Sequence, residues 1–138
     1  YPFKSNHFAT VYADHILEHL DDIPKIFAEI YRITKPHGKL LITSPHFSSM
    51  DSFTDPTHKH FFTSMSFDYF IPGTRLYELR YSNLKFKKNK VIAGPSNIDN
   101  PLLKLLLILI NKNLLMFEKR FAFIFPVGVI QFDLEVIK

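Results

Sequence analysis

The order of apolar and polar positions predicts a strand, a helix and a second strand in the first third of the chain. Residues 8–13 (FATVYA) form a short apolar run rich in β-forming side chains, which is typical of a buried strand. From Ile23 to Ile33, apolar side chains recur at steps of three and four, so they share one face of a helix. A second apolar run, KLLIT at residues 39–43, predicts another buried strand.

Capping and turn residues mark the ends of this helix. Asp21 or Asp22 can cap its N-terminus, and Pro24 is tolerated in the first turn. The sequence PHG at residues 36–38 ends the helix and turns the chain. A strand–helix–strand unit with short connections makes its strands parallel, and ligands of such sheets bind beyond the carboxyl ends of the strands. The residues expected at this edge are Asp14, His15, Ser44, Pro45 and His46.

The rest of the chain predicts a long loop and a closing pair of strands. Residues 46–63 are polar with several aromatic side chains, and their length is typical of a functional loop. A short helix is predicted at 64–70, and strands at 84–92 and 129–137. We expect a single α/β domain with a βαβ unit at 1–45, a loop and helix at 46–70, and closing strands at 71–138 that carry a helical insertion at about 101–124.

Composition excludes several kinds of protein. The 138 residues are 46% hydrophobic and 22% charged, which fits one globular domain with its own core. The lack of cysteine excludes a disulfide framework and a thiolate metal site, and leads us to expect a cytoplasmic protein. The four glycines lie too far apart to build a glycine-rich nucleotide loop. The longest apolar run, residues 105–110, is far shorter than the roughly 20 residues that cross a bilayer.

Charge and histidine are distributed unevenly along the chain. Residues 1–69 carry six Lys+Arg and eight Asp+Glu, a net charge of −2, whereas residues 70–138 carry eleven and five, a net charge of +6. The lysines at 85–90 alternate along a predicted strand, which indicates a solvated face, so no nucleic-acid partner is expected. All seven histidines lie at or before His60, and this half is the better candidate for chemistry.

One short motif matches a zinc-binding pattern. His15, Glu18 and His19 form H-x-x-E-H, which in some zinc hydrolases places two imidazoles and a carboxylate on one helix. Here the motif directly follows a predicted strand, and a new helix begins at 21–22, so the long helix that the pattern requires is missing. Zinc hydrolysis therefore stays an alternative, and no metal site is expected.

The long loop carries a second group of polar residues. The group consists of Asp51, Asp55, His58 and His60, with His46 nearby. Such residues can act as acid and base at a substrate, because histidine titrates near neutrality, or, as a minor alternative, bind a metal ion. Asp55-Pro56-Thr57 is also a favourable turn, in which Asp55 accepts backbone N–H bonds. The substrate-site and the turn interpretations stay equally open, with metal binding third. His58 and His60, two positions apart, would point to opposite sides of an extended segment and are not expected to share a metal ion.

The apolar stretch at 102–117 permits more than one interpretation. It can pack in the core, which is the favoured interpretation, or serve as a membrane-surface helix or a lid over an apolar substrate. A non-enzymatic interaction or membrane-surface module, using this stretch and the basic half, is therefore a further alternative, with peripheral contact to a membrane.

Several short blocks follow one another with the spacing of a known family. They are YPF at 1–3, Phe8, HILEHL at 15–20, Glu29, Arg32, KPHG at 35–38 and Pro45. In order and spacing they resemble the second half of a class I S-adenosylmethionine-dependent methyltransferase of the small-molecule, type 11 group. Thr57-His58, followed by Phe67 and Tyr69-Phe70, resembles the next loop and helix of a subgroup. His37 stands where the family has a glycine, and Ala9 where it has an aspartate.

The resemblance implies a fold and a set of site residues. The fold would be the C-terminal half of a Rossmann-like methyltransferase sheet, with two parallel strands, their helices and a closing antiparallel pair. The cofactor would be S-adenosylmethionine and the acceptor a small molecule. The implied residues are Ala13, Asp14 and His15 at the methionine end of the cofactor, His46, Asp55 and Thr57 at the acceptor, and His58 or His60 as base.

The resemblance also implies that some family features lie outside this sequence. The glycine-rich cofactor loop and the acidic residue that holds the ribose would precede Tyr1. We therefore expect these 138 residues alone to bind the cofactor poorly and to be inactive, and we expect an exposed sheet edge to favour self-association.

Overall fold

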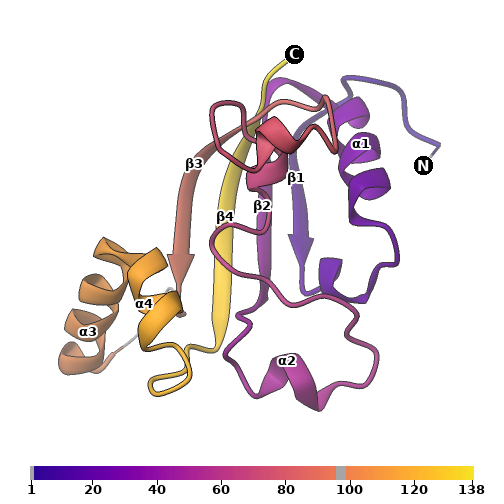
Figure 1. Cartoon of the computed structure of the whole chain (residues 1–138). Coiled ribbons are helices and arrows are strands. Elements are labelled where there is room, and N and C mark those ends of the chain that lie inside the picture. Colours follow the sequence, from indigo (N-terminus) through magenta and orange to yellow (C-terminus); the bar gives the residue numbers. More distant parts are fainter. Residues whose placement is uncertain (1, 96–98) are drawn as a thin grey trace.

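The chain folds around a four-stranded mixed sheet. The computed structural model describes residues 2–95 and 99–138, so the family block at Tyr1 lies partly outside the described residues. The strands are β1 (Phe8–Asp14), β2 (Thr34–Pro45), β3 (Phe86–Ala93) and β4 (Val129–Val136). They lie in the order β1-β2-β4-β3; β1 and β2 are parallel, and β4 is antiparallel to both of its neighbours (Figure 1). The predicted α/β sheet, with two parallel strands and a closing antiparallel pair, is confirmed.

The connection between the parallel strands is α1 (Ile23–Ile33), whose N-cap is Asp22. The Asp22 carboxylate accepts a hydrogen bond from the Lys25 backbone N–H at 2.9 Å. The helix ends at Ile33, three residues before the predicted stop at Pro36, and His37 has the left-handed φ of +59°. At Gly38 a β-carbon would lie 2.6 Å from Thr34 Cγ2, so this glycine is required by close packing. β2 begins at Thr34, five residues earlier than predicted, because β1 pairs with this turn through an irregular register.

The remaining helices are short, except for α3. Their bounds are η1 (Leu17–His19), α2 (Asp51–Thr54), η2 (Asp68–Phe70), η3 (Tyr77–Leu79), α3 (Pro101–Lys112) and α4 (Leu114–Arg120). The prediction of a helix at 64–70 is wrong for most of this segment. The segment forms successive i to i+3 turns, and only η2 within it is helical. In Figure 1, α2 and η1 lie at the end of the sheet where β1 finishes.

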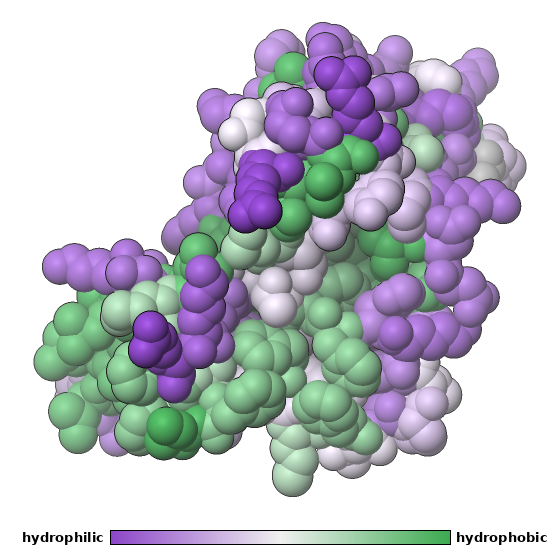
Figure 2. Space-filling model, viewed as in Figure 1, coloured by the Kyte–Doolittle hydropathy of each residue, from purple (hydrophilic) through white to green (hydrophobic). Residues whose placement is uncertain are grey.

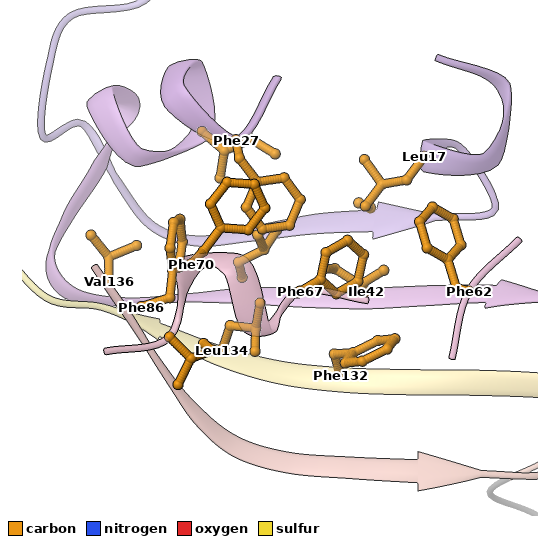
Figure 3. Close-up of a cluster of buried hydrophobic side chains, with 14 of the residues drawn as sticks. Leu17, Phe27, Ile42, Phe62, Phe67, Phe70, Phe86, Phe132, Leu134 and Val136 are labelled. Atoms are coloured by element: carbon orange, nitrogen blue, oxygen red, sulfur yellow. The ribbon is translucent and has the colours of Figure 1, made fainter. Parts of the chain in front are cut away.

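A phenylalanine-rich core covers one face of the sheet (Figure 3). Phe27 of α1 is fully buried and stacks on Phe67 and Phe70, with ring centroids 4.8 and 4.4 Å apart. Beneath these rings lie sheet residues such as Ile42 and Phe132. Burying rings of this size accounts for most of the stabilisation of such a layer.

A second, smaller cluster joins the end of β3 to α3 and α4. Four residues of this cluster are buried together: Ala93, Ile110, Leu114 and Phe117. Most of α3 is exposed by contrast, and the exposed fraction of Leu102 is 75%. The core interpretation of 102–117 therefore holds only for its second half. Figure 2 shows the resulting gathering of hydrophobic side chains over α3 and α4. Among the described residues, no helix combines the length and the apolar character needed to span a membrane.

Candidate functional site

A groove of about 650 Å³ lies at the carboxyl ends of β1 and β2. We call it the histidine groove. Its polar lining includes His15, Glu18, His19, Asp51, Asp55 and His58. The edge expected from the sheet geometry therefore carries a hollow with six titratable side chains.

The backbone turns sharply where β1 ends. His15 has a φ of +47°, and its N–H donates to the Thr43 carbonyl at 2.9 Å. The single 3-10 turn of η1 follows and directs Glu18 inward, where only 1% of this residue is exposed. Ser44 Oγ on β2 donates to Glu18 Oε2 at 2.8 Å. The H-x-x-E-H residues thus lie on a strand end and a tight turn, not along the helix that a zinc hydrolase of this type requires.

Glu18 also ties the long loop to this turn. Its carbonyl accepts the backbone N–H of Lys59 at 2.7 Å and that of His60 at 3.3 Å. These two bonds bring residues 55–60 alongside η1, although about forty positions separate them in sequence. As a result, the His19 and His58 rings lie 4.7 Å apart between centroids.

A chain of hydrogen bonds orients His19. Its Nδ1 lies 2.8 Å from Thr57 Oγ1, and that hydroxyl donates to Asp55 Oδ1 at 2.7 Å. Asp55 Oδ1 also accepts the Thr57 backbone N–H at 2.8 Å. The hydroxyl and backbone bonds from Thr57 hold the pKa of Asp55 below its usual range. Asp55 therefore forms the predicted turn and, in the same place, lines the histidine groove.

His58 and His60 face different hollows. His58 Nδ1 donates to the Ser52 carbonyl at 3.1 Å, and the residue lines the histidine groove. His60 Nε2 donates to the Leu20 carbonyl at 2.7 Å. His60 instead lines a hollow of about 590 Å³ together with Asp21 and Tyr69. The divergence expected from their spacing is observed.

His46, predicted at the acceptor, lies in the interior rather than on a groove wall. It is 0% exposed, and its Nδ1 contacts Ser48 Oγ at 2.7 Å. Its Nε2 lies 3.3 Å from Glu118 Oε1 of α4. The expectation of direct substrate contact is corrected here, because the α4 and loop side chains cover His46. Its position instead links the end of β2 to α4.

Glu118, whose side chain is only 5% exposed, is a polar residue that no sequence motif indicated. Its carboxylate accepts the backbone N–H and the hydroxyl of Ser64, each at 2.6 Å, besides the His46 contact. Burial alone would raise the pKa of Glu118, but the hydrogen bonds from His46 and Ser64 outweigh it, and the pKa lies below its ordinary value. The sequence contains one indication of a special role for Glu118, because it is the only acidic residue between Asp99 and Asp133.

The three residues expected at the cofactor are divided between two sides of the sheet. Ala13 is buried in the core, and His15 lines the histidine groove. Asp14 lines a separate hollow of about 570 Å³ on the other side, which we call the sheet-face hollow, together with Tyr12 and Lys90. The end of β1 therefore lies between these two hollows.

Sequence comparison finds a relationship in the first part of the chain. Residues 1–42 match the family model of the methyltransferase domain. Phosphoethanolamine N-methyltransferase 2 of Caenorhabditis elegans is 42% identical over 43 residues, which are 31% of this chain and 10% of that protein.

Solved structures share the fold of the whole chain. The YcgJ protein of Bacillus subtilis aligns over 100% of this chain and 68% of its own, with 12% identity and a TM-score of 0.59. An S-adenosylmethionine-dependent methyltransferase of Mesorhizobium loti aligns over 96% and 63%, with 11% identity and a TM-score of 0.56. Phosphoethanolamine N-methyltransferase 2 of Haemonchus contortus, solved with S-adenosyl-L-methionine, aligns over 99% and 35%, with 16% identity and a TM-score of 0.51.

The chain thus spans a tenth of its curated relative and between about a third and two thirds of these structures. At these identities the structures support the fold, while the sequence match supports the family. The resemblance found in the sequence is confirmed: residues 1–42 match the methyltransferase domain family, and the chain has the fold of the corresponding part of class I S-adenosylmethionine-dependent methyltransferases.

Proposed function

We propose that this chain takes part in methyl transfer from S-adenosylmethionine to a small-molecule acceptor. The position of the end of β1 carries the proposal. Asp14 lines the sheet-face hollow and the next residue, His15, lines the histidine groove. A cofactor whose methionine end lies against Asp14 and His15, next to the buried Ala13, can present its methyl group to an acceptor in the histidine groove. In-line methyl transfer depends mainly on such alignment.

Residues of the loop are proposed to bind and activate the acceptor. Asp55 offers a carboxylate at the groove, Thr57 supports it from behind through its hydroxyl, and His58 has the geometry of a base. Its Nδ1 proton is held by the Ser52 carbonyl, which leaves the lone pair on Nε2 free to take a proton from an acceptor. His60 is less suited to this role, because it faces another hollow and its Nε2 already donates to Leu20.

The 138 residues alone are proposed to bind the cofactor weakly and to be inactive. Their sequence holds no pair of nearby glycines that could form the cofactor loop. Titration of the ¹⁵N-labelled chain with S-adenosylmethionine tests both the site and its strength. We expect amide shifts centred on Ala13, Asp14 and His15 at millimolar ligand, with His60 as an internal control that does not shift. Tight binding would refute the weak-binding proposal, and shifts confined to the His60 hollow would refute the site.

A second proposed function is contact of the α3 region with an anionic membrane surface. The exposed side chains of α3 are almost all apolar, and Lys104 and Lys112 accompany them. Apolar side chains combined with basic ones suit the interface of an anionic bilayer. Vesicle co-sedimentation tests this. A Leu105→Ser and Leu109→Ser double variant should lose binding, whereas Leu79→Ser, also exposed but on η3, should not. Equal binding by all three proteins would refute the proposal.

The free edge of β1 is proposed to support self-association. β1 lies at the end of the sheet order, and edge strands offer unpaired backbone groups to another copy. Light scattering over a range of concentrations should show a dimer that Thr10→Pro weakens, because proline removes a backbone donor. A monomer at all concentrations would exclude this association.

A further inference from the structure

Three donor atoms converge in the histidine groove, one from each of Glu18, His19 and His58. They all lie within 4.8 Å of one another. Two belong to η1 and the third to the loop that the Glu18 carbonyl holds in place through Lys59. The set differs from the H-x-x-E-H pattern, because His58 replaces His15.

Hydrogen bonding determines which nitrogen of His19 is free. The Thr57 hydroxyl gives its hydrogen to Asp55, so its oxygen can only accept from His19 Nδ1. The Nδ1 of His19 therefore carries the ring proton. Its Nε2 keeps an unprotonated lone pair in the neutral ring.

His58 is held in the same tautomer by a different partner. The Ser52 carbonyl can only accept, so His58 Nδ1 donates to it at 3.1 Å and Nε2 is left with a lone pair. Metal-binding histidines typically donate their second ring nitrogen to a carbonyl or a carboxylate in this way. The outer partners of both histidines are thus already in place.

Glu18 supplies an oxygen that lacks a donor. The residue is 1% exposed, and its Oε2 accepts from Ser44. Its Oε1 is buried and has no hydrogen-bond donor among the described residues. His15 Nδ1 lies 3.3 Å away but without hydrogen-bond geometry, on a ring that is half-exposed. A buried carboxylate oxygen without a donor is costly, and a cation bound to it would remove that cost.

We infer that Glu18, His19 and His58 form a binding site for a divalent transition-metal ion. Two imidazole nitrogens and one carboxylate oxygen suit Zn²⁺ and its neighbours in the first transition series, and leave coordination positions open toward the groove. Asp51 and Asp55 add negative charge to the same groove.

The consequence for catalysis rests on the proposed function. A metal ion on His58 Nε2 would occupy the lone pair that otherwise serves as the base. An acceptor hydroxyl at an open coordination position would then lose its proton more easily, because the bound cation stabilises the oxyanion. The proton passes to solvent, and the acceptor oxygen forms its bond to the methyl carbon as the carbon–sulfur bond of the cofactor breaks.

Calorimetric titration of the untagged, chelator-treated chain with zinc chloride tests the site. We expect about one ion per chain. His58→Ala and Glu18→Gln should each abolish or greatly weaken binding, and Thr57→Val, which removes only an outer partner, should weaken it roughly tenfold to a hundredfold. His37→Ala and His60→Ala serve as matched controls, because these histidines lie outside the groove and should leave the affinity unchanged.

Circular dichroism of each variant shows whether it is folded, and Glu18→Gln preserves the shape of the buried side chain if His58→Ala does not fold. Absence of zinc binding, or binding that both groove variants leave intact, would overturn the inference. Neither result would affect the amide shifts expected with S-adenosylmethionine, so failure of the metal site can be distinguished from failure of the proposed function.

Discussion

Replacing Glu118 by alanine should lower the free energy of unfolding by about 3 kcal/mol. Two strong hydrogen bonds to a charged acceptor contribute roughly 1.5–3 kcal/mol each, and new hydrogen bonds from water to the freed Ser64 groups offset part of the loss. The two bonds come from the Ser64 N–H and hydroxyl, both at 2.6 Å. His46 adds a third contact: its Nδ1 accepts from the Ser48 N–H, so Nε2 carries the proton directed at Glu118. The bonds from Ser64 hold α4 against the loop, and the His46 contact holds it against the end of β2.

The loss should depend on pH in one direction. The pKa of Glu118 is depressed below its ordinary value of 4.5 in the folded chain, so the charged form is favoured by folding. Its contribution is complete above pH 4.5 and is lost as the pH falls through the folded pKa. The difference between the natural chain and Glu118→Gln should therefore shrink below pH 4.5. At pH 7, glutamine should be less destabilising than alanine, because its amide oxygen can still accept from the Ser64 N–H.

Urea denaturation followed by circular dichroism measures these differences. A double-mutant cycle with Ser64→Ala should give a coupling energy of about 1 kcal/mol or more, because the two residues share two bonds. A free energy of unfolding of Glu118→Ala within about 0.5 kcal/mol of that of the natural chain, which is the usual range of surface changes, would contradict this prediction. The prediction also fails if the losses at pH 7 and at pH 3.5 are equal.

Other predictions concern packing, capping and the attachment of α3, and urea denaturation checks the first two. Phe27→Ala should destabilise by roughly 3–5 kcal/mol, because the ring is fully buried among aromatic neighbours. Phe53→Ala, at a ring that is 63% exposed, should change stability far less, and equal losses would contradict the argument. Asp22→Ala should cost about 1 kcal/mol through the lost N-cap bond of α1, which a neutral result would disprove. Asn111→Ala should speed amide exchange throughout α3, because its side chain bonds both the N–H and the carbonyl of Ala93 at 2.8 Å; unchanged exchange would count against this.

The βαβ unit could be predicted from the sequence because its signals are local. Apolar runs define β1 and the centre of β2, and the Asp22 cap defines the start of α1, whereas the turn near His37 indicates its end, at Ile33, only to within about four residues. The exposure of α3 could not be predicted in this way. Periodicity shows which positions are apolar, but it does not show whether another element covers them, and the side chain of Leu102 is 75% exposed.

The position of the site could be predicted, but its composition could not. Sheet topology places His15 at the carboxyl edge of β1, as expected. The approach of His58 to His19 depends on a backbone bond from Lys59 to Glu18, which leaves no trace in the spacing of residues. His46 is also a histidine at this edge of the sheet, like His15, yet it is buried beneath α4. Its contact there, Glu118, lies more than seventy positions away in the sequence.

Some residues of the H-x-x-E-H block stabilise the fold, and others line the histidine groove. The left-handed turn at His15 ends the pairing of β1 with β2, and a non-glycine residue is strained there. That turn directs Leu17 into the core and Glu18 beneath the groove. There Ser44 donates to one carboxylate oxygen, while the other has no donor in the part of the chain that the structure describes. His15 itself stays half-exposed at the rim. A continuous helix would bring His15 and His19 onto one face, whereas this turn separates them and makes His58 the partner of His19. The block thus marks the place of the site, while the loop supplies its remaining ligand.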